Sequence, residues 1–436
     1  MSEFLVHLYT FMSELMASQR IFMRELSRER KINRAGCSLT VRGSLAASCC
    51  RQPLPSNNRE QNCRTQKGRR TINVTRRDLL GLAALGAGSL ALSACQSGDK
   101  GAQAGNVTAQ ASLAPGDGYS KDDSGRSTTY QAKGHELLAG LGSFETICQP
   151  RAAQGRVEQL TYQTHSYVWE EANPGQEFLV SKAINVWLPA DYDASRTYDV
   201  LYLMHGTGHE GASYWLTDEE DCHGSQTRAL LDGMVEDGLI KDVIVACPSY
   251  YSFPAGEEPA DVLAYHQADS HADDWPRLFW KELRESVIPL VESIYPTHAA
   301  GDVSDAGLAA SRDHRGFAGL SRGSMTSVNS VNSAMMHCLD LFGWIGSYSG
   351  IWADFDEFRG VIEGQYVDLP VSYWYNGNGS KDFSLQNHEE FRDNVLGQMG
   401  DRFADGQNYC WVSFPGGTHD YDCWALDLYN SLLAFF

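Results

Sequence analysis

The sequence lacks a hydrophobic run long enough to cross a membrane as a helix. Its apolar, Gly/Ala-rich stretch from Leu79 to Ala94 has 16 residues, whereas a membrane-spanning helix needs about 20. None of the 11 cysteines stands in a Cys-x-x-Cys pair, a spacing typical of structural zinc sites. We therefore expect neither a membrane-spanning helix nor a structural zinc ion.

Positive charge is scarce in most of the chain, whose formal net charge is -20. Residues 1–94 carry 15 Lys and Arg against 6 Asp and Glu, but the remaining residues carry 20 against 49. An acidic body repels phosphate backbones and anionic membrane surfaces. We therefore expect no nucleic-acid partner, and we expect a neutral substrate.

The change of charge coincides with a targeting signal from Thr75 to Cys95, "TRRDLLGLAALGAGSLALSAC". Arg76 and Arg77 form a twin-arginine pair before the apolar stretch, and the final Leu-Ser-Ala-Cys resembles a lipobox, whose cysteine is acylated after cleavage. A buried helix would explain neither the arginine pair nor the cysteine. The signal predicts an exported lipoprotein, anchored through Cys95 to the outer face of the cytoplasmic membrane, or a secreted protein.

The segments on either side of this signal differ in composition. Residues 1–74 precede a signal that should start a chain, so we expect them to be untranslated in the cell or to form a disordered basic extension. Residues 96–134 are rich in Gly, Ala, Ser and Asp and predict a flexible tether. Residues 135–436 are the predicted folded domain, with six cysteines whose disulfide pairing the sequence leaves open.

Apolar runs alternate with helical patterns from about residue 155 onward. Continuous runs predict strands covered on both faces, and an alternating run predicts a half-exposed strand. The predicted strands are 182–189 (alternating), 199–206, 242–248, 315–320, 343–350, 370–377 and 409–417. Helical periods occur at 230–235, from Asp274 as N-cap to Ile294, and from Met325 to Cys338. This alternation predicts a mostly parallel sheet with helices on both faces.

A Gly-x-Ser-x-Gly pentapeptide, Gly319 to Gly323, joins a predicted strand to a predicted helix. Alone, this pattern fits a structural serine as well as a nucleophile. A nucleophile elbow needs a strand before it, a helix after it, and an acid and a histidine later in the chain. Asp382 and His419 each follow a late predicted strand, so Ser321, Asp382 and His419 are the predicted catalytic residues.

Other side chains offer alternatives to these assignments. Three further carboxylates compete for the role of the acid: Asp354, Asp356 and Asp368. His205 and His209 raise the alternative of a metal site, but they lie in a Gly-rich loop without the helix that would align them. We therefore expect no metal.

Ester chemistry at Ser321 also needs backbone N–H groups that face the developing oxyanion. Arg322, the residue after the nucleophile, is one expected donor, and Thr207, in the Gly-rich loop after an early strand, is the other. Four aromatic residues near strand ends are candidates for lining a sugar or phenol pocket, although packing in the core is equally expected for each: Tyr214, Trp215, Tyr250 and Tyr251.

Three stretches, "INVWLPADYDASRTYDVLYLMHGTG", "HRGFAGLSRGSM" and "PGGTHDYDCW", resemble carbohydrate esterase family one. The similarity is greatest to the feruloyl esterase domains found attached to bacterial xylanases, and it covers about residues 155–436. The resemblance implies an α/β-hydrolase fold with a triad of Ser321, Asp382 and His419. Ser324 departs from the family, which often has glycine there, and we expect no attached xylanase or carbohydrate-binding module.

These observations predict a serine esterase that hydrolyses acylated carbohydrate or small esters without a cofactor. The expected substrates are feruloyl or acetyl esters of a xylan-like polysaccharide. Two alternatives stay open. One is acyl transfer to a sugar, as in the mycolyltransferases that share this fold. The other is a non-catalytic, glycan-binding surface lipoprotein, although a binding module has no need to keep three catalytic partners in register.

Overall fold

A computed structural model describes residues 71–74, 119–121, 127–129, 131–132, 134–208, 210–220, 222–268, 272–324 and 334–436. The predicted signal from Thr75 to Cys95, including the cysteine predicted to be acylated, lies outside these residues. So do nearly all of the predicted N-terminal extension and much of the predicted tether. In the part of the chain that is described, no helix has both the length and the apolar character that a membrane crossing requires.

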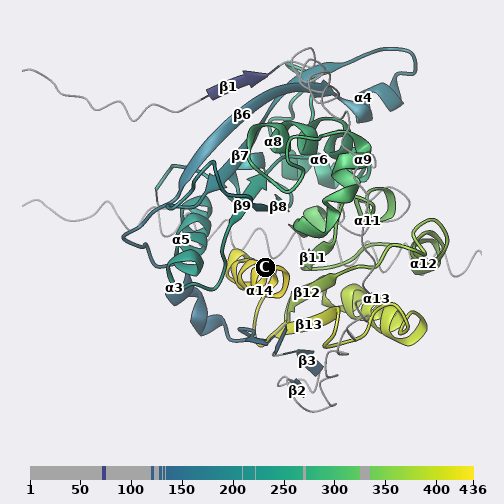
Figure 1. Ribbon diagram of the computed structural model, residues 1–436. Coiled ribbons are helices and arrows are strands. Elements are labelled where there is room, and N and C mark those ends of the chain that lie inside the picture. Colours follow the sequence, from purple (N-terminus) through teal and green to yellow (C-terminus); the bar gives the residue numbers. More distant parts are fainter. Residues whose placement is uncertain are drawn as a thin grey trace, which may run out of the picture. The chain divides into compact units, whose positions relative to one another are not determined.

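Nine strands of the described residues form one sheet (Figure 1). In spatial order they are β1 (Thr71–Val74), β6 (Arg156–His165), β7 (Leu179–Leu188), β9 (Val243–Cys247), β8 (Asp199–Met204), β10 (Arg315–Leu320), β11 (Trp344–Tyr348), β12 (Tyr373–Gly379) and β13 (Tyr409–Phe414). Only β7 runs against its neighbours, and every other neighbouring pair in this sheet is parallel. The sheet is therefore mostly parallel, as the sequence predicts.

Two short antiparallel pairs lie outside this sheet. They are β2 (Tyr119–Lys121) with β3 (Ser127–Thr129), and β4 (Gln131–Ala132) with β5 (His135–Glu136).

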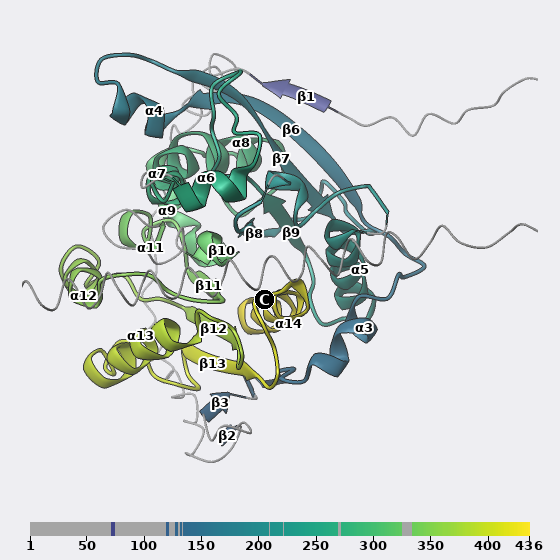
Figure 2. The same ribbon diagram turned by 180° about the vertical axis from the view of Figure 1, so that it is seen from behind.

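Helices cover both faces of the large sheet (Figures 1 and 2). One face packs against α3 (Phe144–Ile147), α5 (His223–Glu236) and α14 (Tyr421–Phe435). The other packs against α4 (Tyr167–Ala172), α6 (Val262–Ala268), α7 (Asp274–Glu282), α8 (Ile288–Ile294), α9 (Asp305–Ala310), α11 (Ala334–His337), α12 (Phe355–Gly364) and α13 (Leu385–Gln398).

The helix predicted from Asp274 to Ile294 is continuous, because a π-helical segment, Leu283–Val287, joins α7 to α8. Its N-cap is Asp273 rather than the predicted Asp274. The carboxylate of Asp274 instead accepts a hydrogen bond from Arg277, 2.8 Å away, within the first turn. The predicted cap residue therefore stabilises the helix as one member of an ion pair.

Alternation along the central strands divides their side chains between two cores. On β8, Val200, Tyr202 and Met204 belong to one core, whereas Leu201 and Leu203 belong to the other. All five are at most 1% exposed. Burial on both faces explains why this strand reads as a continuous apolar run.

The six cysteines of the predicted domain are free thiols, and five of them are buried. Burial raises the pKa of Cys148 and of Cys338 to about 12. These thiols therefore stay protonated at neutral pH and contribute apolar packing instead of disulfide bonds.

The carboxyl ends of the parallel strands gather the loops that carry the predicted site. Gly206 and Thr207 follow β8, Ser321 follows β10, Asp382 follows β12 and His419 follows β13. Such an edge is where open α/β sheets bind ligands. The fold thus brings together side chains that are up to about 200 residues apart in sequence.

Candidate active site

Ser321 occupies a sharp turn between β10 and the helical residues 322–324. Its backbone φ angle is +51°, in the left-handed region that costs a non-glycine residue roughly 1–2 kcal/mol. A Cβ atom on Gly323 would lie 2.5 Å from the carbonyl oxygen of His205, and one on Gly319 would collide with the backbone of Gly323. The two glycines are therefore required by the close approach of strand, turn and helix.

Ser324, where the resembled family often has glycine, is fully buried in this turn. Its hydroxyl group donates a hydrogen bond to the carbonyl oxygen of Gly350, 2.6 Å away. The hydroxyl group therefore has a partner, and the departure from the family is accommodated without an unpaired polar atom.

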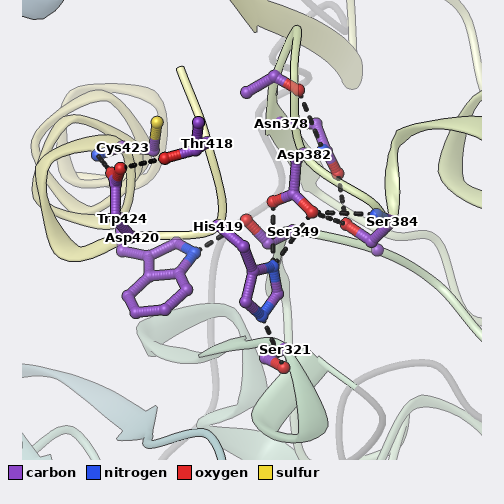
Figure 3. A network of polar contacts seen from close by, with 12 residues as sticks. Ser321, Ser349, Asn378, Asp382, Ser384, Thr418, His419, Asp420, Cys423 and Trp424 are labelled. Atoms are coloured by element: carbon purple, nitrogen blue, oxygen red, sulfur yellow. Dashed lines mark hydrogen bonds and ion pairs between the residues drawn. The ribbon is translucent and has the colours of Figure 1, made fainter. Parts of the chain in front are cut away.

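The side chains of Ser321, His419 and Asp382 form one hydrogen-bonded chain (Figure 3). Nε2 of His419 lies 3.0 Å from Oγ of Ser321. Nδ1 of His419 lies 3.0 Å and 2.9 Å from the two carboxylate oxygens of Asp382. With Nδ1 protonated and donating to Asp382, the lone pair of Nε2 is free to accept the serine proton.

The carboxylate of Asp382 is fixed and kept ionised by its neighbours. The backbone N–H and the hydroxyl group of Ser384 both donate to Oδ1 of Asp382 over 2.8 Å. Burial alone raises the pKa of Asp382, but hydrogen bonds from His419, Ser384 and Ser349 and the charge of His419 outweigh it. The pKa of Asp382 consequently lies below its usual range, as an acid that stabilises an imidazolium requires.

The three competing carboxylates serve elsewhere. Asp354 caps α12 by accepting a hydrogen bond from the backbone of Glu357. Asp356 pairs with Arg359 on the exposed side of the same helix, and Asp368 is exposed beyond its end. Of the four candidates, Asp382 is the one that the structure places against His419.

The loops that hold Asp382 and His419 are packed against each other. A Cβ atom on Gly379 would lie 2.5 Å from the carbonyl carbon of Gly417, so the two backbones touch. The backbone N–H of Lys381 donates to the carbonyl oxygen of Gly417 over 2.8 Å. Because these contacts join the loops after β12 and β13, the relative placement of acid and histidine is set by backbone atoms.

The residue after His419 anchors the histidine loop to α14. Asp420 is the N-cap of this helix, and its side chain accepts a hydrogen bond from the backbone of Cys423. One turn on, the indole N–H of Trp424 donates to the hydroxyl group of Ser349, 2.7 Å away. The ring of Trp424 meets that of His419 edge to face at 5.0 Å. His419 is thereby held at the start of a buried helix (Figure 3).

The loop after β8, where the sequence predicts part of an oxyanion hole, passes beside Ser321. A Cβ atom on Gly206 would lie 3.3 Å from that of Ser321. The guanidinium group of Arg322 donates to the hydroxyl group of Thr207 over 2.8 Å and to the carboxylate of Asp273 over 2.8 Å. The two residues predicted to supply the oxyanion amides are therefore linked through their side chains.

His205 supports this loop from within the protein. Its Nδ1 lies 2.5 Å from the carbonyl oxygen of Gly206, and its Nε2 lies 2.9 Å from the hydroxyl group of Ser249. Burial lowers the pKa of His205 to about 4, so the ring is neutral, with Nδ1 as donor and Nε2 as acceptor. Both nitrogens of His205 therefore have hydrogen-bond partners within the protein. His209 lies outside the described residues.

Two of the four aromatic residues predicted to line the pocket are core residues instead. Trp215 and Tyr250 are at most 1% exposed, and their polar atoms donate to the carbonyl oxygens of Met204 and Gly206. Their prediction as substrate contacts is therefore wrong, because a residue that follows a strand end can still turn inward. Tyr214 and Tyr251 are partly exposed, so their role as substrate contacts stays a prediction.

Phe383 is the aromatic residue that sequence reasoning missed. It is 66% exposed, and its ring centroid lies 4.4 Å from that of His419. Its position directly after the predicted acid is the one sequence feature that links Phe383 to the site. Nothing in its local sequence distinguishes it from a core phenylalanine, and only the loop geometry shows its exposure.

Asp199, His298 and His314 form the one group of described residues whose donor atoms gather as a metal site requires, within 4.8 Å of one another. They lie at the opposite ends of β8 and β10 from Ser321. The two imidazole rings stack in parallel, 3.4 Å apart, so one ion cannot lie in the planes of both rings. Nδ1 of His314 lies 2.7 Å from Asp199, and the group is a hydrogen-bonded cluster as it stands.

Comparison with known proteins agrees with this architecture. Residues 180–435 match the model of the family described as "Putative esterase". A curated relative, endo-1,4-beta-xylanase Y of Acetivibrio thermocellus, is 32% identical over 170 residues, which are 39% of this chain and 13% of that protein. The chain therefore matches a small part of that relative's length.

Solved structures show the same fold. A mutant of the feruloyl esterase module from Clostridium thermocellum, complexed with sinapinate, matches with a TM-score of 0.52 and 24% identity, over 67% of this chain and 92% of that one. A CE1 ferulic acid esterase from Anaeromyces mucronatus, in complex with ferulic acid, matches with a TM-score of 0.50 and 19% identity, over 67% and 95%. These likenesses, with the mostly parallel sheet, confirm the predicted α/β-hydrolase fold.

Proposed function

Because this chain belongs to the family described as "Putative esterase", and is thus a carboxylic ester hydrolase, we propose that Ser321, His419 and Asp382 are its catalytic triad. The observation that carries the proposal is the chain of contacts from Asp382 through both nitrogens of His419 to Oγ of Ser321. A serine that serves only the fold has no need of a histidine positioned by a buried carboxylate.

In the proposed reaction, Oγ of Ser321 attacks the acyl carbonyl carbon while Nε2 of His419 takes the hydroxyl proton. The backbone N–H groups of Thr207 and Arg322 stabilise the oxyanion. The intermediate then collapses, and His419 returns the proton to the leaving alcohol. Water repeats the sequence on the acyl-serine, which releases the acid and restores Ser321. Asp382 holds His419 in the required tautomer and stabilises the imidazolium throughout.

The substrate that we propose is an acylated carbohydrate, with feruloyl or acetyl esters of a xylan-like polysaccharide as the first candidates. The names of the relatives support this choice, since they include a xylanase and feruloyl esterases. Beyond residue 94 the chain has 49 acidic and 20 basic residues, and this negative balance also favours a neutral substrate.

A panel of esters tests the proposal. Wild type and Ser321→Ala are compared on methyl ferulate, acetylated xylan and a nitrophenyl acetate, and we expect turnover by the wild type alone. Labelling with a fluorophosphonate probe separates an esterase from a non-catalytic glycan-binding protein, which would not react. Adding a sugar acceptor to the assay distinguishes hydrolysis from acyl transfer, because transfer would yield a new sugar ester in place of the free acid.

We also propose that the protein is exported and anchored through an acylated Cys95, or secreted. The support is the twin-arginine pair, Arg76 and Arg77, followed by an apolar stretch and a lipobox-like end. Mass spectrometry of the mature protein should find Cys95 as a lipidated N-terminus. Peptides from residues 1–70 in that material would contradict the proposal.

A further inference from the structure

We propose that Phe383 is the surface on which the alcohol part of the substrate, a neutral sugar ring, stacks during ester hydrolysis. The inference rests on the proposed triad, because it takes its direction from the proton transfer by His419. It adds a specificity-determining residue on the leaving-group side of the site.

The exposure of Phe383 is the first observation. Its side chain is 66% exposed, while its neighbours in the chain, Asp382 and Ser384, are 6% and 1% exposed. The exposed large hydrophobic residues of the described part also include Leu179, Leu263 and Val367, and Phe383 is the most exposed and the one aromatic residue of the four. The loop therefore buries the acid and turns the aromatic ring outward.

The position of the ring against His419 is the second observation. The two ring centroids are 4.4 Å apart and the planes are inclined by 42°. Trp424 also contacts the imidazole ring of His419, edge to face. Trp424 is only 8% exposed and donates a hydrogen bond to Ser349, so packing in the core explains its contact with His419. Phe383 has no such burial, and its free face is available to a ligand.

The proton transfer from His419 to the leaving group indicates which part of the substrate lies against Phe383. His419 must return a proton to the alcohol oxygen, so that oxygen has to come within about 3 Å of Nε2. The carbonyl oxygen faces the other way, toward the loops after β8 and β10 that contain Thr207 and Arg322. Phe383 follows β12, and β11 separates β12 from β10 in the sheet. The ring thus lies on the alcohol side of the scissile bond.

The chemistry of the ring and its surroundings selects a sugar. An aromatic face offers apolar contact area and no hydrogen-bonding groups, which suits the C–H face of a pyranose or furanose. The leaving methanol of a methyl ester has no ring to place on it. Discrimination by Phe383 should therefore depend on the size of the alcohol and not on the acyl group.

The test compares esters that share an acyl group and differ in the alcohol. Wild type and Phe383→Ala are assayed on methyl ferulate and on feruloylated arabinose, and again on methyl acetate and acetylated xylose. We expect kcat/KM of Phe383→Ala to fall about tenfold on each sugar ester, equivalent to about 1.4 kcal/mol, mainly through KM. On the methyl esters it should stay within about twofold of wild type.

Matched variants sharpen this comparison. Phe383→Trp should restore the preference for the sugar ester, because it keeps an aromatic face. Val367 is 56% exposed and lies between α12 and β12. Val367→Ala should therefore leave kcat/KM unchanged on both the methyl and the sugar esters. Free arabinose should inhibit the wild type more strongly than Phe383→Ala, because it occupies the same surface without the acyl group.

The outcomes separate the inference from the proposed function. Equal losses on methyl and sugar esters would overturn the inference, because Phe383 would then act through His419 or the acyl group. Unchanged kinetics on both esters would overturn it as well. Failure of the wild type to hydrolyse any of the four esters would overturn the proposed function and the inference with it.

Discussion

The hydroxyl group of Tyr250 donates a hydrogen bond to the carbonyl oxygen of Gly206, 2.8 Å away. This carbonyl belongs to the same peptide unit as the N–H of Thr207. Because a trans peptide is planar, with its carbonyl and N–H pointing in opposite directions, Tyr250 and His205 together turn the Thr207 N–H away from the core. A buried tyrosine thereby sets the orientation of a proposed oxyanion donor.

We predict that Tyr250→Phe lowers kcat by roughly tenfold with little change in KM. The ring would still fill its buried site, but the Gly206 peptide would lose one of the two groups that orient it, a loss worth about 1 kcal/mol. Steady-state kinetics on one soluble ester measures the effect. Tyr295→Phe, which removes a hydroxyl group that donates to Glu158 over 3.0 Å, is the matched control and should keep the wild-type kcat. Wild-type kcat in Tyr250→Phe would refute the role.

We predict that Ser321→Ala lowers the rate by about 10⁴-fold or more, since the members of a triad act as a unit. Fluorophosphonate labelling should disappear as well. The fold should be kept, because the side chain is small and partly exposed. Ser324→Ala is the control: it removes a buried hydrogen bond to Gly350, so it should lower stability by about 1–3 kcal/mol while leaving the labelling intact. Residual activity above a few per cent in Ser321→Ala would exclude this nucleophile.

We predict that Asp382→Asn leaves the protein folded and lowers the rate by several orders of magnitude. The amide can hold the wrong tautomer of His419; a comparable change in a serine protease cost about 10⁴. Asp354→Asn, at the N-cap of α12, provides the contrast: some stability should be lost and the rate kept. If Asp382→Asn kept a rate within threefold of wild type, Asp382 would not be the acid of the triad.

We predict that the free energy of unfolding falls as the pH is lowered from neutral. Burial lowers the pKa of His205 to about 4 and that of His388 to about 3, whereas histidine in an unfolded chain titrates near 6.5. Below about pH 6.5 the unfolded chain therefore binds protons that the folded chain does not. Each histidine should remove roughly 2 kcal/mol between about pH 7.5 and about pH 5, and its contribution levels off below the folded pKa.

Urea unfolding of His388→Gln at the two pH values measures this contribution. The variant should be less stable than wild type at both, but its loss on acidification should be smaller by roughly 2 kcal/mol. Gln398→Ala, at an exposed residue of the same helix α13, removes no titrating group and should retain the wild-type loss. An undiminished loss in His388→Gln would show that acid sensitivity comes from other groups.

The sheet was predictable where burial on both faces leaves a continuous apolar run, as in β8 and β10. β6 was missed because it lies near the edge of the sheet and its sequence, "RVEQLTYQTH", is largely polar. α14 was not predicted from the sequence because this helix is buried on nearly all sides. Thirteen of its 15 residues are buried, so it shows no contrast between an apolar and a polar face.

The site was predictable as far as it depends on chain order and spacing. Gly-x-Ser-x-Gly at the end of a strand, followed by Asp382 and His419, is a local pattern that the fold must bring together. Side-chain direction within a loop is not local. Trp215 turns inward because Met204 offers it a carbonyl oxygen, whereas Phe383 turns outward because Asp382 and Ser384 occupy the interior of its loop.

The backbone contact between Gly379 and Gly417 joins two of the loops that carry the proposed triad, so the proposed catalytic residues lie in two blocks. One block carries Asp382 and His419 on loops that touch, and the other carries Ser321 beside Gly206. Among the three triad side chains, the 3.0 Å contact between His419 and Ser321 is the bond that spans the seam between them. A small shift between the loop after β10 and the loops after β12 and β13 should therefore break this contact and stop catalysis, although the sheet that carries all of these loops stays intact.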